Sequence, residues 1–401
     1  MSVPTPTAAT ARVAVAALFF ANGALFANVV PRYPELKAAL ELSSAAFGSA
    51  VAAYGLGALV LGLLSGVLVS RFGSGRVAPI STIAIAANLV LVGVAPSWLT
   101  LAAALFIAGS LDATADLANN AHGLAVERIY RRSILNSLHG VWSIGAVVGG
   151  AMGAAAAGLG IPLGWHLSIA ATLFAVLAVT ASRFLLPGGH TTPERAPNTH
   201  QAVHRRHVLR GLHIARTLLT LGVIAAMAQI MEDSTATWSA VYLRENLGAA
   251  PGVSGLGFIA LQAFQTAGRF LADRGVTRYG DRAIARTGAT VAGAAMAIAL
   301  AAPGIATTVI GFAAVGLGIG SLIPASMRTA DDMPGLPRGV GMSMVGTVDR
   351  VAIMTAPLLI GVIADARSLR VGLIVIPVAA TVVLLLARAL PTRHARPARI
   401  R

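Results

Sequence analysis

The stretch VAAYGLGALVLGLLSGVLVSRFGSGR, from Val51 to Arg76, is almost entirely apolar until it reaches a loop that contains arginine. An apolar run of about 20 residues crosses the roughly 30 Å hydrocarbon core of a bilayer as an α-helix. Similar runs recur along nearly the whole chain. We predict twelve membrane spans, at residues 11–30, 45–69, 77–95, 98–122, 135–158, 163–186, 214–240, 252–273, 283–302, 305–327, 341–364 and 369–390.

The composition supports this interpretation. The chain of 401 residues is 56 % hydrophobic and 11 % charged, and its mean hydropathy is +0.77. These values exclude an ordinary soluble domain. The sequence therefore predicts an all-α integral membrane protein, with twelve transmembrane helices arranged in two six-helix bundles.

The formal net charge of +15 is compatible with binding to nucleic acid or with membrane topology. The position of the charged residues favours membrane topology, because most arginines fall in loops on the same side as the N-terminus. The predicted opposite side holds only Arg32, Lys37, Arg244, Arg367 and Arg370. The positive-inside rule then puts both termini in the cytoplasm, with the excess charge facing anionic lipid. We expect no nucleic-acid partner.

A polar stretch at 187–213, with proline, histidine and arginine, separates six spans from six. We expect an N-terminal bundle at 1–186, a cytoplasmic linker at 187–213, a C-terminal bundle at 214–390 and a basic cytoplasmic tail at 391–401. Arg71-Phe72-Gly73 follows the second span and Arg278-Tyr279-Gly280 follows the eighth. This repeated turn indicates a duplication, with the two halves related by a pseudo-two-fold axis along the membrane normal.

Small residues recur at helical spacing within two spans. Gly145, Gly149 and Gly153 are four residues apart in the fifth span, as are Gly62 and Gly66 in the second. Such spacing lets membrane helices approach closely. We expect helix packing here, with contact to a substrate as the alternative.

Several motifs resemble the major facilitator superfamily, and the resemblance covers essentially the whole chain. They include the loop after the second span and the stretches DLANNAHGLAVERIY (Asp116 to Tyr130) and GRFLADRGVTRYG (Gly268 to Gly280). The nearest branch that we recognise is an uncharacterised bacterial group near the fucose-permease-like proton symporters.

The resemblance implies loop charges that latch one conformational state. Ser70 stands where the family loop has an acid, so we expect the latching charge mainly in the second half. The latch residues implied by the family motif are Gly66, Arg71, Gly73, Arg76, Arg269, Asp273, Arg278 and Gly280.

Polar side chains inside the N-terminal spans are candidates for function, because an ionisable group at mid-bilayer is costly unless it is paired or solvated. Asp112, Asp116 and Asn120 share one helical face by their spacing of four residues. Asp116 is our first candidate for proton coupling and Asp112 is a further one, with a structural carboxylate as the alternative, and Asn120 is a candidate for solute binding. The remaining candidates for solute binding in this half are Asn22, Phe26, His139 and Trp142, each of which also suits helix packing or an exposed position.

The C-terminal spans carry a second set of such groups. Glu232, Asp233 and Asp349 are further candidates for proton coupling. Asp349 and Arg350 are neighbours on a helix and point about 100° apart, so each needs a partner from another helix. The candidates for solute binding are Trp238, Gln262, Gln265 and Arg350, with interfacial or helix-joining roles as alternatives.

These features together favour a proton-coupled secondary transporter of a small polar or amphipathic organic solute that works by alternating access. Symport is the favoured mode, antiport efflux of drugs or metabolites is the alternative, and a non-transporting membrane receptor is a minor one. The chain has no cysteine and no phosphate-binding Gly-Lys-Ser/Thr loop, and we expect neither an enzyme nor a cofactor or metal. The single lysine and the abundant arginine and alanine suggest a high-GC bacterial genome, so we expect a bacterial inner membrane. We also expect the protein to be a monomer.

Overall fold

The computed structural model describes residues 7–131, 134–186, 208–337 and 339–392, and within these ranges the chain is helical with no β-strand. Two compact units form. Unit 1 contains Met1–Thr199 and Ala240–Ile259, and unit 2 contains His200–Ser239 and Ala260–Arg401. The predicted all-α fold class is confirmed.

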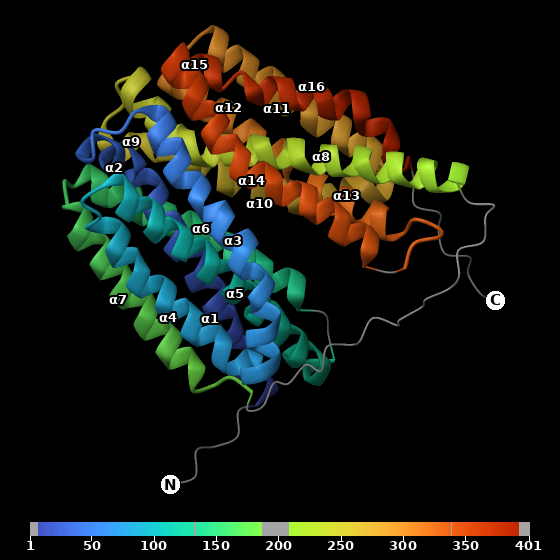
Figure 1. Cartoon of the computed structure of the whole chain (residues 1–401), viewed down its shortest axis with the longest axis horizontal. Helices are drawn as coiled ribbons and strands as arrows, with labels where there is room; N and C mark the ends of the chain where they lie inside the picture. Colours follow the sequence, from blue (N-terminus) through green and yellow to red (C-terminus); the bar gives the residue numbers. More distant parts are fainter. Residues whose placement is uncertain (1–6, 132–133, 187–207, 338, 393–401) are drawn as a thin grey trace. The chain divides into compact units, whose positions relative to one another are not determined.

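Unit 1 is built from long helices that pack in pairs (Figure 1). Helix α1 contacts α6, α3 contacts α5, and α4 lies between α5 and α7. Its elements are α1 (Ala8–Val29), η1 (Val30–Arg32), α2 (Tyr33–Ala39), α3 (Ser44–Phe72), α4 (Ser74–Gly93), α5 (Trp98–Tyr130), α6 (Leu135–Gly158), α7 (Leu163–Ser182), η2 (Tyr242–Asn246) and α9 (Pro251–Ser254).

Unit 2 pairs α11 with α12 and α16, and α14 with α13 and α15. Its elements are α8 (Val208–Val241, whose last two residues belong to unit 1), α10 (Leu256–Tyr279, from Ala260 onward), α11 (Asp281–Ala301), α12 (Ile305–Ile319), α13 (Leu322–Asp331), α14 (Val340–Ala366), α15 (Leu369–Gly372), α16 (Val375–Leu386) and η3 (Ala387–Ala389).

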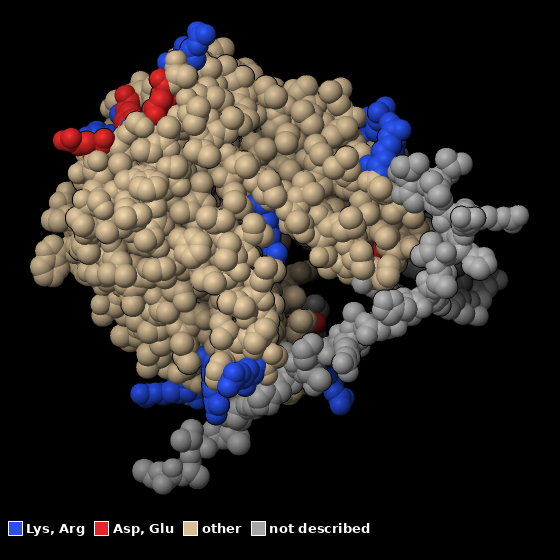
Figure 2. All heavy atoms as spheres, viewed as in Figure 1, with Lys and Arg blue, Asp and Glu red and all other residues tan. Residues whose placement is uncertain are grey.

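Eleven helical segments of the described chain are long and apolar enough to cross a membrane. Helix α10, with 24 residues, is the remaining long helix, and its polar side chains include Gln262, Gln265 and Arg269. Together they agree with the predicted twelve-helix architecture. Figure 2 shows charged side chains mainly at the ends of the helices, with a broad surface between them that is nearly free of charge on this face.

Two of the spans, α3 and α5, begin with side-chain caps. The Ser97 hydroxyl accepts from the Thr100 backbone N–H, and the Thr100 hydroxyl accepts in turn from the Ser97 N–H, so α5 starts with a capping box. Ser43 caps α3 in the same way through the Ala46 N–H. These caps satisfy backbone donors that would otherwise be left open at the start of a span.

The segment Ala240–Ile259 belongs to unit 1 although it follows the predicted linker. Lys37 Nζ lies 2.8 Å from Glu245 Oε2. Gly252 is close to Gly158, since a Cβ added at Gly252 would lie 3.1 Å from the Gly158 Cα. These contacts, together with those between α6 and α9, hold the segment on the N-terminal helices.

The turn that repeats in the two halves of the sequence also repeats in backbone conformation. Gly73 has φ 82° and ψ 143°, and Gly280 has φ 84° and ψ 161°. Only glycine adopts this region easily. Each glycine is preceded by an arginine stacked on a ring, Arg71 over Phe72 at 5.6 Å and Arg278 over Tyr279 at 5.2 Å. The repeat predicted from the sequence is therefore present in both units.

The glycines of α6 pack against the backbone of α1, as the sequence predicts. A Cβ added at Gly145 would collide with the Phe20 carbonyl, and one at Gly149 with the Ala24 carbonyl. In α3 the prediction holds less well. A Cβ at Gly62 would make an ordinary 3.4 Å contact with Ala113, and one at Gly66 would meet nothing within 4 Å. Helix packing therefore does not require Gly66.

Candidate functional site

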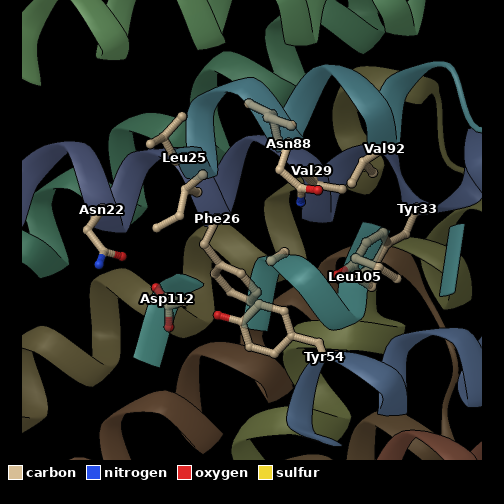
Figure 3. Close-up of a pocket in the computed structure, with 13 residues that line it drawn as sticks. Asn22, Leu25, Phe26, Val29, Tyr33, Tyr54, Asn88, Val92, Leu105 and Asp112 are labelled. Atoms are coloured by element: carbon tan, nitrogen blue, oxygen red, sulfur yellow. The ribbon is translucent and has the colours of Figure 1, made fainter. Parts of the chain in front are cut away.

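A pocket lies inside unit 1 among α1, α3, α4 and α5, with one residue from α2 (Figure 3). Most of its lining is apolar, and a few polar groups converge on it. Its lining residues are Asn22, Leu25, Phe26, Val29, Tyr33, Tyr54, Ile85, Asn88, Leu89, Val92, Leu105, Ala108 and Asp112. Such a lining is typical of sites for small organic ligands.

Asp112 is the ionisable group of this pocket. Its carboxyl group hydrogen-bonds with the side chains of Tyr54 and Asn22. Figure 3 shows the Tyr54 hydroxyl directed toward Asp112, with the Phe26 ring beside the Tyr54 ring. The centroids of these two rings are 5.6 Å apart. Three predicted residues, Asn22, Phe26 and Asp112, are thus brought together at one pocket.

Tyr54 and Asn88 are among the pocket residues that the sequence analysis missed. Tyr54 comes from α3, and Asn88 comes from α4. The Asn88 side chain is 4 % exposed, and its Nδ2 donates to the Ala104 carbonyl at 2.9 Å. Its Oδ1 has no hydrogen-bond partner among the described residues. The available signal was an amide isolated within the apolar run from Ile83 to Val92.

A second polar row joins α5 to α6. Asn120 Nδ2 donates to Asp116 Oδ1 at 2.8 Å, and Asn120 Oδ1 lies 3.1 Å from His139 Nε2. The Phe19 ring meets the His139 ring edge to face at 5.3 Å. Asp116 and His139 are exposed and Asn120 is half-buried. We call Asp116, Asn120 and His139 the Asp116 row, and all three are predicted candidates.

Trp142 and Trp238 lie in packed surroundings. Trp142 is half-buried against the hydrophobic core of unit 1. Trp238 is fully buried, which rules out the alternative that it belongs to an exposed aromatic belt.

Unit 2 gathers three carboxyl groups, Glu232 and Asp233 on α8 and Asp349 on α14. We call them the carboxyl cluster. Asp233 is close enough to both Glu232 and Asp349 for their charges to interact, and Asp349 interacts with Glu232 in the same way. Asp349 is 9 % exposed. The buried atoms Asp233 Oδ2 and Asp349 Oδ1 have no hydrogen-bond partner in the described part of the chain.

Neutral amides and arginine side chains interact with the carboxyl cluster. Gln265 Nε2 on α10 donates to Glu232 Oε2 at 2.6 Å. Gln229 hydrogen-bonds with Asp233, and the charge of Arg269 acts on Glu232. If all three carboxyl groups were ionised, Arg269, which acts on Glu232, and Arg350, which acts on Asp349, would still leave one of them uncompensated. The cluster can therefore lower its electrostatic energy by taking up protons.

The other predicted residues of unit 2 differ in exposure. Gln262 is 3 % exposed, and its Oε1 has no partner among the described residues. Arg350 is exposed whereas its neighbour Asp349 is buried, as expected for adjacent positions on a helix. The charge of Arg350 still acts on Asp349.

The repeated turns make contacts that the sequence analysis did not identify. In unit 2, Asp281 directly follows Gly280. Its Oδ1 atom lies 3.3 Å from Arg328 Nη2 on α13. In unit 1 the corresponding residue is Ser74, directly after Gly73, and its hydroxyl lies 3.3 Å from His122 Nδ1. One turn is therefore held by an ion pair and the other by a neutral hydrogen bond.

The expected latch residues themselves are distributed differently. Arg71 and Arg278 stack on neighbouring rings, and Arg76 is exposed. Arg269 lies beside the carboxyl cluster. Asp273 belongs to α10, but its side chain lies outside the described residues.

Within the described residues there is no group of three or more His, Cys, Asp or Glu side chains arranged to hold a metal ion. The architecture of long apolar helices, a duplicated turn and polar side chains within the spans is that of a membrane transporter. The chain matches the family model "Major Facilitator Superfamily" at residues 15–242 and 218–401, and it belongs to this superfamily.

Known proteins agree with this assignment. The chain is 30 % identical over 374 residues to the uncharacterized transporter y4wD of Sinorhizobium fredii, covering 93 % of this chain and 96 % of that protein. It is 28 % identical over 360 residues to the membrane protein MosC of Rhizobium meliloti, covering 89 % of this chain and 84 % of MosC. These relatives indicate a transporter rather than an enzyme.

Two solved structures share the fold. The crystal structure of the nucleoside transporter NupG superposes with a TM-score of 0.73 at 14 % identity, covering 94 % of this chain and 97 % of that one. A bacterial homolog of the human lysosomal transporter Spinster, in an inward-facing and unoccupied conformation, gives a TM-score of 0.73 at 16 % identity, covering 99 % and 100 %. At this identity the likeness concerns the fold alone.

Proposed function

We propose that this protein is a proton-coupled secondary transporter that moves a small polar or amphipathic organic solute across a membrane by alternating access. The observation that carries the proposal is the carboxyl cluster of unit 2. Ionisable side chains inside membrane spans are costly and commonly mark proton or substrate pathways. Three carboxyl groups on which two arginines act form a group whose charge changes when a proton binds.

The arrangement around the cluster suits reversible proton binding. Gln265 and Gln229 are neutral hydrogen-bond partners, and they remain in place whether the carboxyl groups are ionised or not. Arg269 limits the net charge without cancelling it. A purely structural salt bridge would instead match each acid with a base.

Asp116 of unit 1 is the second proposed proton-binding group. It accepts a hydrogen bond from Asn120, which in turn contacts His139, so a change at Asp116 is transmitted to a titratable ring. The solute is proposed to bind at the pocket of Asn22, Phe26 and Asp112. Trp142 in unit 1, and Trp238, Gln262, Gln265 and Arg350 in unit 2, stay predictions for solute contact that rest on the sequence.

Symport is the proposed mode, because the carboxyl cluster and the pocket are separate sets of residues and can be occupied at the same time. One observation favours antiport as a second candidate. Asp112 lines the pocket itself, so a proton and a cationic solute would compete for one carboxylate. When a proton and a solute compete for one site, the protein carries one of them in each direction, which is antiport.

The surroundings of the protein follow from the arginine distribution. We infer from it that both termini are cytoplasmic and that anionic lipid lies at the basic loops. We also propose that the protein is a monomer in a bacterial inner membrane. Symport, antiport and the receptor alternative can be told apart by whether the solute crosses the membrane and in which direction it moves relative to the proton.

A two-step experiment tests the proposed function. Thermal-shift screening of the purified protein against sugars, organic acids, nucleosides and drugs identifies solutes that bind. Each one is then measured in proteoliposomes under an imposed pH gradient. Accumulation driven by inward proton flow supports symport, and extrusion supports antiport. Saturable binding with no flux in either direction would contradict transport and indicate a receptor.

A further inference from the structure

The pocket of unit 1 offers hydrogen-bond acceptors rather than donors. Asp112 contributes a carboxyl group, and Asn88 contributes a buried Oδ1 atom that has no hydrogen-bond partner among the described residues. Donors of the lining are already engaged, because Asn88 Nδ2 donates to the Ala104 carbonyl and the side chains of Tyr54 and Asn22 hydrogen-bond with Asp112. A ligand that fits these groups must therefore bring its own N–H or O–H donors.

The charge of the pocket also indicates the charge of the ligand. None of the described residues that line it is Lys or Arg, and the nearby charge acting on Asp112 comes from another acid, Asp116. A cationic donor would compensate the Asp112 carboxylate, whereas a neutral hydroxyl would not. Hydrogen bonds between charged partners are roughly twice as strong as neutral ones.

The rest of the lining determines the body of the ligand. Leu25, Val29, Ile85, Leu89 and Leu105 provide an apolar wall, and the Phe26 and Tyr54 rings lie next to the carboxyl end. Aromatic faces near a carboxylate also attract an organic cation. An apolar body with one ammonium group matches every part of this lining.

We propose that this pocket binds an amphipathic organic amine, with its ammonium group on Asp112 and its apolar body along α1, α4 and α5. This inference deepens the proposed transport function by naming the class of solute, and it rests on that function only for the claim that the bound amine is carried across the membrane.

Equilibrium binding tests the inference without any gradient. Titration calorimetry is performed on the full-length protein in detergent micelles with three probes of similar shape: 2-phenylethylammonium, neutral 2-phenylethanol and the N,N,N-trimethyl derivative of the ammonium. We expect the primary ammonium to bind at least about tenfold more tightly than the alcohol. The trimethyl derivative should bind more weakly than the primary ammonium, because it has no N–H to donate.

Variants locate the site. Asp112→Asn should reduce the affinity for the ammonium by at least about tenfold and leave the affinity for the alcohol nearly unchanged. Asn88→Leu should leave the preference for the ammonium over the alcohol nearly unchanged, because Asn88 bonds to Ala104, about two helical turns from Asp112. Asp332→Asn and Asn136→Leu, both at exposed positions away from the pocket, serve as matched controls.

Equal affinities for ammonium and alcohol, no saturable ammonium binding, or an Asp112→Asn protein that binds as the wild type would overturn the inference. The comparison of the three probes needs only the wild-type protein, so it decides even if a variant does not fold. Failure of proton-coupled flux with intact ammonium binding would contradict the proposed function alone. Coupled flux of another solute without ammonium binding would contradict this inference alone.

Discussion

The hydrogen bonds of Asp116 define what a substitution there can change. Asn120 Nδ2 donates to Asp116 Oδ1 and also to the Asp116 carbonyl, so the amide is fixed by two contacts on one helix turn. His139 then contacts the other end of the same amide. Replacing the carboxylate by an amide keeps the shape of this row and removes its ability to exchange a proton.

We therefore predict that Asp116→Asn keeps solute binding, loses accumulation driven by a pH gradient and retains exchange of labelled for unlabelled solute. The neutral side chain mimics the protonated state, which can still change between conformations. Counterflow and gradient-driven uptake in the same proteoliposomes measure the two properties separately. Asp332→Asn is the control for loss of one negative charge. Wild-type accumulation by Asp116→Asn would exclude Asp116 from coupling.

At the scale of elements, the turns at Gly73 and Gly280 are the most constrained points of the backbone. Their φ angles of 82° and 84° are positive and their ψ angles are extended. Side chains with a Cβ rarely adopt this conformation. Gly66 lies in the middle of a helix, and its surroundings have space for a Cβ.

We expect Gly280→Ala to lower the free energy of unfolding by about 1–3 kcal/mol, because the substitution strains the turn. Gly66→Ala is the matched control and should be neutral or stabilising by up to about 1 kcal/mol, since alanine favours the helix. Thermal unfolding followed by tryptophan fluorescence in one detergent compares the two. A Gly280→Ala protein as stable as Gly66→Ala would contradict the assigned turn conformation.

The sequence predicted elements better than it predicted the contacts between them. Helical spacing placed Asp112, Asp116 and Asn120 on one face of α5, and the structure keeps them there. Tyr54 reaches Asp112 from another helix, α3, and α3 approaches α5 closely because Gly57 and Gly109 have no side chains at the contact. No period within a single helix encodes that approach, so Tyr54 and Asn88 were missed.

The same limit applies to the charged groups. Asp233 and Asp349 are far apart in the sequence, and their proximity depends on the packing of α8 and α14 in unit 2. Arg269 was assigned to a loop latch by resemblance, but it occupies the helix that carries Gln265 and acts on Glu232. Chemical types were predictable from the sequence, whereas partners required the fold.

At the scale of the whole molecule, the arginine asymmetry predicts how the chain crosses the membrane. An alkaline phosphatase fused after Leu390 should be inactive, because we expect that end in the cytoplasm. A fusion after Gly248, in the loop between α8 and α10, should be active and serves as the control. High activity from the Leu390 fusion would contradict the proposed topology.

The central claim is that the carboxyl cluster couples solute movement to protons. The most direct measurement is the ratio of protons to solute moved in proteoliposomes, with an internal pH dye and a solute identified by thermal-shift screening. Glu41→Gln, at an exposed position outside the spans, is the control. We predict that wild-type protein and Glu41→Gln move protons with the solute, whereas Glu232→Gln, Asp233→Asn and Asp349→Asn together exchange solute without moving protons. A triple variant that keeps the wild-type ratio would contradict the claim.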